Sequence, residues 1–330
     1  MDKGLKLAAA VLCAVVLGAC GKGGDDAGAK ADAITVGFSQ VGAESEWRTA
    51  NTRSVKEALA APEFSLKFSD AQQKQENQIK ALRSFIAQGV DVIAFSPVVE
   101  SGWETVLREA RAANIPVVLT DRAVDVSDES LFVTLIGSDF VEEGRRAARW
   151  LVDDSKDQAG QAPAGSIRIV ELQGTVGSAP AIDRMAGFKE VIGQDPRFAV
   201  VRSQSGDFTR AKGKEVMEAF LKAEGRDGID VLFAHNDDMA IGAIQAIEEA
   251  GLKPGEDIRI VSIDGVRGAF EAMKAGKLNA TVECNPLLGP QLAQIIRDVQ
   301  AGKPVPKRVV VDEGVFTRDQ AAAELPKRKY

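Results

Sequence analysis

The run Pro116-Val117-Val118-Leu119-Thr120-Asp121-Arg122 decides the fold class of this 330-residue chain. A short apolar run leads without a spacer into a carboxylate and a guanidinium, as in a buried parallel strand that ends at a polar edge. The pattern recurs where Val231–His235 leads into Asn236-Asp237-Asp238, and where Arg259–Ile263 leads into Asp264-Gly265. Because open α/β sheets bind ligands at the carboxyl ends of their strands, we expect these polar residues to form a binding site.

Strand-like runs alternate with amphipathic stretches from Ile34 onward. The first half predicts strands at Ile34–Ser39, Ser65–Ser69, Val90–Phe95 and Pro116–Thr120, with helices near Glu46–Ala60, Lys74–Gln88 and Trp103–Ala113. After Val133–Ile136 and a helix from Asp139, the second half predicts strands at Ser166–Leu172, Phe198–Gln204, Val231–Ala234 and Arg259–Ile263. Such alternation indicates parallel sheets with helices on both faces. The predicted fold class is therefore α/β, with two doubly wound parallel-sheet lobes.

The two lobes are expected to be joined by a hinge of three chain segments. The predicted crossings lie near Ile136–Asp139, Val282–Pro286 and Val309–Asp312. They assign residues 33–137 and 284–309 to an N-terminal lobe, and residues 138–283 and 310–330 to a C-terminal lobe. We expect a hinged cleft between the lobes.

The N-terminus has the features of a targeting segment. Lys3 and Lys6 precede the apolar run Leu7–Leu17, which is too short for the roughly 20 residues that span a bilayer. Residues 1–19 are therefore predicted to be a signal peptide. The sequence Leu17-Gly18-Ala19-Cys20 resembles the lipobox of bacterial lipoproteins, so we expect Cys20 to be lipidated and residues 20–32 to form a lipid anchor and flexible tether. The alternative is an ordinary signal peptide followed by a cysteine by chance.

Composition narrows the class of ligand. The formal net charge is -7 and the sequence pI is about 5.1, with both signs interspersed, which argues against a nucleic-acid partner. If Cys13 leaves with the signal peptide and Cys20 is acylated, Cys284 is alone and no intramolecular disulfide can form. A monomer that binds a small neutral ligand fits these features.

Sugar recognition needs hydrogen-bonding groups for hydroxyls and an aromatic face for the apolar side of the ring. Trp47 and Arg48 follow the first predicted strand, and Phe208 follows the strand Phe198–Gln204. Alternatives stay open for each candidate. Trp47 and Phe208 could pack in a core, Asp121 with Arg122 could form a local salt bridge or turn, Asn236 could be a helix N-cap, Asp264 could mark a turn, and Asp183 with Arg184 could be a solvated pair.

Signatures of catalysis are missing from the sequence. There is no Gly-x-Ser-x-Gly elbow, no Walker loop and no His-Glu-x-x-His or paired-cysteine metal spacing. His235 is the single histidine, and an isolated histidine beside a strand end is more often structural than catalytic. We therefore expect no enzyme activity, no cofactor and no metal.

Five long stretches resemble the periplasmic sugar-binding proteins of ABC importers, in particular the galactofuranose-binding branch of the ribose-binding-like group. These stretches are Ile34–Gly42, Gln72–Ala81, Glu171–Gly177, Ser203–Arg210 and His235–Met239. The similarity extends from about Ile34 to Val311. It implies the type I fold of periplasmic binding proteins.

The resemblance also implies a role for individual residues. Trp47 and Arg48 would touch the sugar ring, Asp121 and Arg122 would bind its hydroxyls, and Phe208 would pack on it. Arg184, with Asp183, would reach in from the second lobe, and Asn236 and Asp264 would complete the polar set. The sequence departs from ribose-type members, which carry Gln at the position of Cys284, so Glu283 is expected to take that role.

These features predict a periplasmic or otherwise extracytoplasmic, lipid-anchored protein. It is expected to capture galactofuranose or a related furanose or pentose and to deliver the sugar to an ABC permease. A sugar-binding presenter for a chemoreceptor or sensor kinase is the alternative. A LacI-like repressor shares the lobes, but a signal peptide occupies the place of its DNA-binding helices.

Overall fold

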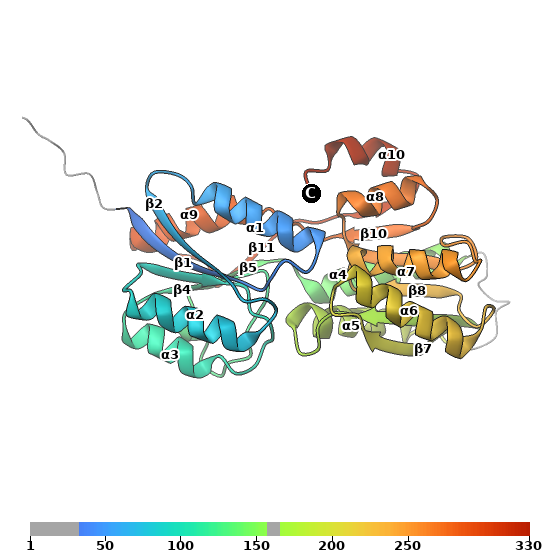
Figure 1. The fold of residues 1–330 in the computed structure, drawn as a ribbon, viewed down its shortest axis with the longest axis horizontal. Helices are drawn as coiled ribbons and strands as arrows, with labels where there is room; N and C mark the ends of the chain where they lie inside the picture. The colour runs from blue at the N-terminus through green and yellow to red at the C-terminus, as the bar shows by residue number, and fades with distance from the viewer. Residues whose placement is uncertain (1–32, 157–165) are drawn as a thin grey trace, which may run out of the picture. The chain divides into compact units, whose positions relative to one another are not determined.

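The computed structural model describes residues 33–156 and 166–330, which form two sheets with helices on both faces of each (Figure 1). We call each sheet with its helices a lobe. The predicted fold class is confirmed.

The first lobe contains a six-stranded sheet in which every strand pairing is parallel, in the order β11-β5-β4-β3-β1-β2. Its strands are β1 (Ile34–Gln40), β2 (Phe64–Asp70), β3 (Val92–Phe95), β4 (Val117–Thr120), β5 (Thr134–Gly137) and β11 (Arg308–Val310). The helices of this lobe are α1 (Glu46–Ala58), α2 (Gln75–Ala87), α3 (Glu104–Ala112) and α9 (Gly289–Gln300), and a short 3-10 turn η1 spans Glu129–Leu131.

The central strands of the first sheet are buried on both faces because helices cover both. In β3, Val92 and Ala94 belong to the same core cluster as residues of α1 and α9, whereas Ile93 and Phe95 belong to the cluster that includes residues of α2 and α3. This alternation follows from the two-residue period of a strand. It explains why β3 reads as a continuous apolar run, as parallel strands in such sheets do.

The second lobe contains a six-stranded sheet in the order β12-β10-β9-β8-β6-β7, which is parallel except where β12 runs antiparallel to β10. Its strands are β6 (Ile167–Gln173), β7 (Phe198–Ser205), β8 (Val231–Ala234), β9 (Arg259–Asp264), β10 (Ala280–Glu283) and β12 (Val315–Thr317). Its helices are α4 (Phe140–Asp154), α5 (Ala179–Ile192), α6 (Arg210–Glu224), α7 (Asp237–Glu249), α8 (Arg267–Lys274) and α10 (Ala321–Glu324), with the 3-10 turn η3 (Leu325–Lys327).

The described chain passes between the two sheets at three places. After β5 it continues into α4, which packs against α5 and β10 of the second lobe. After β10 it continues into α9, which packs against α1 of the first lobe, and after β11 it enters β12, which pairs with β10. We call these three places the first (residues 138–139), second (residues 284–288) and third (residues 311–314) crossing segments. The residue limits expected for the two lobes stay a prediction.

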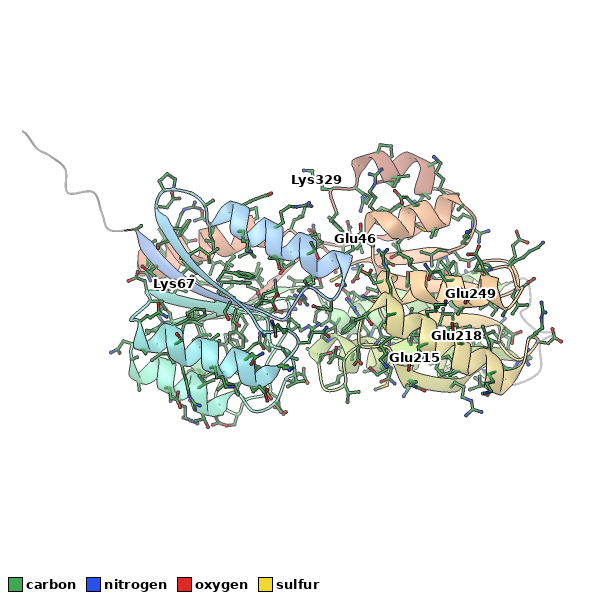
Figure 2. All side chains as sticks on the ribbon, in the orientation of Figure 1. Glu46, Lys67, Glu215, Glu218, Glu249 and Lys329 are labelled. Carbon is green, nitrogen blue, oxygen red and sulfur yellow. The ribbon has the colours of Figure 1, made fainter. Side chains whose placement is uncertain are left out.

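Charged residues lie on the outer faces of the helices. Glu215 and Glu218 of α6 and Glu249 of α7 project from the second lobe (Figure 2), where Lys214 Nζ lies 2.7 Å from Glu249 Oε1. Opposite charges are therefore interspersed on this surface, as the sequence indicated. Within the described part of the chain, no helix is both long and apolar enough to cross a membrane.

Candidate functional site: a cavity between the lobes

A cavity opens at the carboxyl ends of strands from both sheets, with about 290 Å³ of empty space that includes its opening to solvent. We call it the interlobe cavity, and its walls are formed by Glu44, Ser45, Trp47, Arg48, Asp121, Arg122, Pro180, Arg184, Phe208, Asn236, Asp264 and Cys284. Eight of the ten predicted ligand residues thus line one space.

On the first lobe, two arginines and two acidic residues form a buried network. Arg48 Nη2 donates to Asp121 Oδ2 at 2.7 Å, and Arg48 Nε donates to Glu44 Oε1 at 3.1 Å. Arg122 Nη1 donates to the Val98 carbonyl at 3.1 Å. Burial and the nearby Arg48 guanidinium lower the pKa of Arg122 to about 10, so Arg122 stays charged at neutral pH.

On the second lobe, Arg184 of α5 is fixed by two acceptors. Its Nε donates to Glu143 Oε2 of α4 at 2.7 Å, and its Nη1 donates to the His235 carbonyl at 2.6 Å. Burial by itself lowers the pKa of Arg184, but the Glu143 carboxylate and other nearby negative groups more than offset it, and the pKa is raised overall. The Nη2 atom lies 3.7 Å from Asp264 Oδ1, which is beyond a direct hydrogen bond. One end of this guanidinium is therefore available to a ligand.

Two aromatic side chains from different lobes line the cavity. The indole Nε1 of Trp47 donates to the Cys284 carbonyl at 2.6 Å, and the Arg48 guanidinium lies 4.6 Å from the Trp47 ring centre. The Phe208 ring lies 5.3 Å from the Arg122 guanidinium and packs against Gly174, where a Cβ atom would collide with the ring. Trp47 and Phe208 also belong to a hydrophobic core cluster. Each ring therefore packs in the core and lines the cavity at the same time.

Asn236 follows β8 and Asp264 ends β9, as the sequence indicated. Asn236 caps α7, because its Oδ1 accepts from Met239 N at 3.0 Å, and its Nδ2 donates to the Phe208 carbonyl at 3.2 Å. Burial raises the pKa of Asp264 well above its usual range. A neutral carboxyl of this kind can donate a hydrogen bond to a ligand hydroxyl.

The backbone of the cavity wall is strained at three residues that are not glycine. Asp121, Phe208 and Asp264 have φ angles of 64°, 61° and 137°. Such conformations cost on the order of 1–3 kcal/mol each and persist where the surrounding structure requires them. All three residues are predicted ligand contacts that follow or end a strand.

Several polar atoms of the cavity wall lack a hydrogen-bond partner. Among the described side chains, Glu44 Oε2, Arg122 Nε and Asp264 Oδ2 are buried and unpaired. An unpaired buried polar group costs about 1–3 kcal/mol. A polyhydroxyl ligand would satisfy such groups.

The structure places two predicted residues outside the cavity. Asp183 lies one residue before Arg184 and lines a neighbouring groove with Asp139 and Arg308. Glu283 Oε1 accepts from Arg328 Nη1 at 2.9 Å and from the Tyr330 hydroxyl at 3.1 Å, so this side chain anchors the C-terminal residues. Of the two adjacent residues Glu283 and Cys284, between which the sequence does not decide, Cys284 lines the cavity.

Glu44, Ser45 and Pro180 were missed by the sequence argument. The spacing of Glu44 and Arg48 is the i,i+4 pattern of an ion pair, which is a signal that could have identified Glu44. His235 contacts Glu171 Oε1 through Nε2 at 3.0 Å and is fully buried, and burial lowers its pKa. It has a structural role, as expected.

Comparison with known proteins decides the family. Residues 36–304 match the family model described as a periplasmic binding protein domain. This chain belongs to the periplasmic binding protein family. Its relatives are solute-binding proteins rather than enzymes, and this periplasmic binding protein shares that class.

Several relatives are described with furanose sugars. The galactofuranose-binding protein YtfQ of Escherichia coli K12 is 50% identical over 298 residues, which are 90% of this chain and 92% of that protein. A Mycobacterium smegmatis protein in complex with β-D-fucofuranose is 55% identical, with a TM-score of 0.86 over 90% of this periplasmic binding protein and 96% of that chain. The binding protein of the arabinose ABC transporter from Shewanella sp. ANA-3, bound to α- and β-L-arabinofuranose, is also 55% identical, with a TM-score of 0.84 over 89% and 95% of the chains.

Proposed function

We propose that this protein captures a monosaccharide in the interlobe cavity and delivers it to an ABC importer. Galactofuranose or a related furanose or pentose is the proposed ligand. The observation that carries the proposal is the cavity wall, where three arginines, buried carboxyls and two aromatic rings from both lobes surround a small space. With Asp264 neutral, the three arginines face the two carboxylates of Glu44 and Asp121, so the cavity wall carries little net charge, which suits a neutral polyol.

The proposed ligand contacts are the residues that line the cavity and carry hydrogen-bonding or aromatic groups. We infer that they are Trp47, Arg48, Asp121, Arg122, Arg184, Phe208, Asn236 and Asp264. Sugar hydroxyls both donate and accept, so they can pair with the unpaired Arg122 Nε and with the unpaired carboxyl oxygens of Glu44 and Asp264. The rings of Trp47 and Phe208 would cover the apolar C–H face of the sugar.

We propose that the bound sugar is delivered to an ABC transporter. The Shewanella relative is a component of an arabinose ABC transporter, and a Bacillus subtilis relative that is 34% identical over 241 residues is a ribose import binding protein. We infer a monomer that closes on its sugar and presents both lobes to a permease, with no nucleic-acid partner. A deletion strain should lose uptake, at low external concentration, of the labelled sugar that calorimetry shows to bind, and unchanged uptake of that sugar would contradict this role.

A second candidate function is presentation of a sugar to a sensor. It is favoured by the likeness to the fructose-binding periplasmic domain of the hybrid two-component system BT1754, which is 26% identical with a TM-score of 0.79. Loss of a sugar response with normal uptake would favour this candidate, whereas loss of uptake favours transport.

Lipid anchoring is proposed for Cys20, which lies outside the described residues together with the predicted signal peptide and tether. We predict that Cys20→Ser moves any exported protein from the membrane fraction to the soluble fraction, because the substitution removes the acylated thiol. Cell fractionation followed by immunoblotting measures this change. Cys284→Ser is the control and should stay in the membrane fraction. Membrane association that survives Cys20→Ser would contradict the anchor.

Calorimetry tests the binding function directly. D-galactose, L-arabinose, D-fucose, D-ribose and D-fructose would each be titrated into the mature protein at pH 7. We expect saturable heat with at least one sugar whose solution contains furanose forms, and loss of that heat in Asp121→Asn. The matched control is Asp227→Asn, an exposed acidic residue that is not part of the cavity wall. The absence of saturable heat with every sugar would overturn the proposal.

A further inference from the structure

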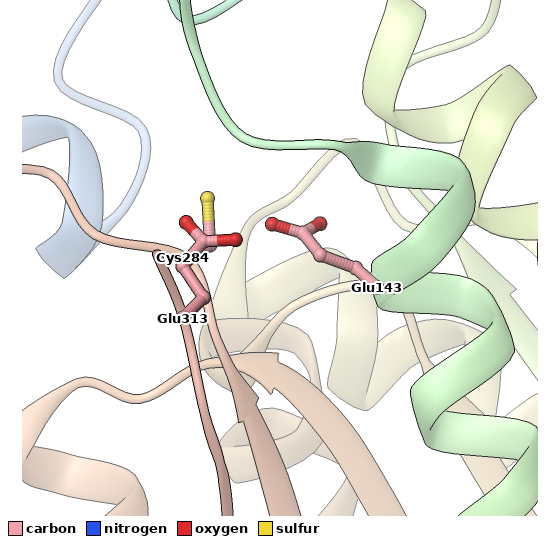
Figure 3. Close-up of side chains that lie close together, drawn as sticks. All are labelled: Glu143, Cys284 and Glu313. Atoms are coloured by element: carbon pink, nitrogen blue, oxygen red, sulfur yellow. The ribbon is translucent and has the colours of Figure 1, made fainter. Parts of the chain in front are cut away.

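The three crossing segments meet in a small, largely buried cluster beside the interlobe cavity (Figure 3). Ser138 comes from the first crossing segment, Cys284 from the second and Glu313 from the third. The Ser138 hydroxyl donates to Glu313 Oε1, and its Oγ lies 3.3 Å from Cys284 Sγ. Asn285 N also donates to Glu313 Oε1, at 2.9 Å. Glu313 therefore ties together all three connections between the lobes.

The same cluster reaches the arginine that lines the cavity. Glu143 of α4 directs its carboxyl group toward Cys284 and Glu313 (Figure 3), and one carboxyl oxygen of each glutamate and Cys284 Sγ all lie within 4.8 Å of one another. Glu143 Oε2 accepts from Arg184 Nε at 2.7 Å, whereas Glu143 Oε1 is buried without a partner among the described residues. Glu143 thus stands between Arg184 and Glu313.

Two carboxylates this close in a buried place do not both ionise easily. Glu143 has the guanidinium of Arg184 as a direct partner. Within the described part of the chain, the side chain of Glu313 accepts only from the neutral groups of Ser138 and Asn285. Glu313 is therefore the carboxyl that holds a proton. Burial, followed by the Glu143 carboxylate, raises the pKa of Glu313 to about 8.

The arginines around Glu313 are compatible with this assignment. Arg146 of α4 donates to the Glu313 backbone carbonyl at 2.5 Å and not to its carboxyl group. Arg308 of β11 donates to the Ser138 carbonyl, and Arg184 is paired with a carboxylate of α4. No arginine of the described residues thus forms an ion pair with the Glu313 side chain.

The remaining titratable groups near Glu313 belong to the second crossing segment and to β10. Burial raises the pKa of the Cys284 thiol well above its usual range, so the thiol stays neutral. Glu283 is paired with Arg328, 2.9 Å away. Neither group supplies a positive charge that would favour ionisation of Glu313.

We propose that Glu313 is a positioning residue of the sugar site, which as a neutral carboxyl keeps the Glu143–Arg184 pair in place and which weakens sugar binding when it ionises. This inference rests on the proposed function. A protonated Glu313 has a hydrogen to donate toward Glu143, whose Oε1 lacks a partner. When that proton is lost, a second negative charge faces Glu143 and competes with it for Arg184, and Arg184 no longer meets the ligand at a fixed position.

The experiment measures, between pH 6.5 and pH 9 by calorimetry, the dissociation constant of each sugar that binds among D-galactose, L-arabinose, D-fucose, D-ribose and D-fructose. For the wild-type protein we expect the dissociation constant to rise about tenfold between pH 7 and pH 9. Glu313→Gln should bind with nearly the wild-type affinity at pH 7 and should keep that affinity at pH 9, because glutamine is neutral at both. Asp312→Asn is the matched control, since Asp312 is the exposed neighbour on the same segment, and it should follow the wild-type profile.

The outcomes separate this inference from the proposed function. Sugar binding by the wild-type protein with a flat pH profile overturns the role of Glu313 and leaves the binding function standing, and this arm needs no variant. A folded Glu313→Gln protein that keeps the wild-type pH profile also overturns it. A wild-type protein that binds none of the five sugars named above at any pH overturns the proposed function and this inference together.

Discussion

Several side chains of the interlobe cavity bury polar atoms that lack a hydrogen-bond partner among the described residues, which lowers the stability of the ligand-free protein. Arg122 is 3% exposed, and its Nε has no hydrogen-bond partner among the described residues, although it lies 3.6 Å from Asp121 Oδ2. Burying a charged group without full pairing destabilises a protein. Such a group is better explained by a contact that the ligand completes than by packing.

We predict that Arg122→Ala weakens sugar binding about ten- to a hundredfold, because a hydrogen bond from a charged group contributes roughly 1.5–3 kcal/mol. The melting temperature of the sugar-free protein should stay within a few degrees, since the substitution also removes a partly unpaired buried charge. Calorimetry and a thermal melt measure the two effects. Arg83→Ala is the control, because Arg83 forms an exposed ion pair with Glu109 and should change neither quantity. Normal affinity with a lowered melting temperature would show that Arg122 is structural.

The raised pKa of Glu313 predicts how the free energy of unfolding depends on pH. Its carboxyl keeps its proton in the folded protein up to a pKa of about 8, whereas it ionises near its ordinary pKa of 4.5 in the unfolded chain. Its contribution to the free energy of unfolding is therefore fully present below pH 4.5 and is lost as the pH rises through about 8. As the pH falls from about 8 to about 5, the melting temperature of the wild-type protein should rise by several degrees more than that of Glu313→Gln. Equal slopes in the two proteins would contradict a retained proton.

Among the elements, the close approach of α4 and α5 sets the position of Arg184. A Cβ atom at Gly144 would collide with the Arg184 carbonyl oxygen, and one at Gly187 would collide with the Val141 carbonyl oxygen. Only glycine allows this contact between the two helix backbones. The contact brings Glu143 on α4 within hydrogen-bonding distance of Arg184 on α5.

We predict that Gly187→Ala separates α4 from α5, lowers the melting temperature and weakens sugar binding by at least about tenfold. The physical reason is that the facing backbone cannot yield to a Cβ atom without moving a helix, and the Glu143–Arg184 pair depends on that spacing. Lys189→Ala is the control, since Lys189 is exposed on the same helix. Thermal melts measure the stability of both variants, and calorimetry measures their affinity for the sugar. A Gly187→Ala protein with normal stability and affinity would contradict the prediction that the α4–α5 contact positions Arg184.

For the whole molecule, contacts at the rim of the cavity join the lobes directly. Arg210 of α6 donates to Glu46 Oε2 of α1 at 2.9 Å and to Asp238 Oδ1 at 2.5 Å, and Asp238 Oδ2 accepts from Glu46 N at 2.7 Å. On another side, Glu100 N donates to the Gly177 carbonyl at 2.9 Å. These contacts, together with ligand groups divided between the lobes, are what a hinged closure around a sugar requires.

We predict that saturating sugar reduces the radius of gyration measured by small-angle scattering, because the sugar bonds to both lobes and favours the closed state. A radius of gyration that sugar leaves unchanged would indicate a rigid receptor.

We also predict that Arg210→Ala shifts the sugar-free protein toward the open state and raises the dissociation constant of the sugar a few-fold. This dissociation constant should depend less on salt concentration than that of the wild-type protein. Lys222→Ala on the same helix is the control.

The sequence alone determined the fold class and most of the cavity. Buried apolar runs that end in polar residues identify strands of a sheet covered on both faces, and the carboxyl ends of parallel strands necessarily share one edge. Asp121, Arg122, Asn236 and Asp264 follow from that geometry without any knowledge of packing. Helix caps such as Asn236 were also readable, since they depend on neighbouring residues only.

The tertiary structure decided which of two adjacent side chains enters the cavity. Successive residues in extended backbone point to opposite sides. Cys284, which directly follows β10, therefore lines the cavity, whereas Glu283 points away from it. One step along a helix turns the side chain by about 100°, which separates Asp183 from Arg184. Glu313 joins the cluster beside the site only because the crossing segments meet in space, and sequence patterns report on neighbours along the chain rather than on such distant contacts.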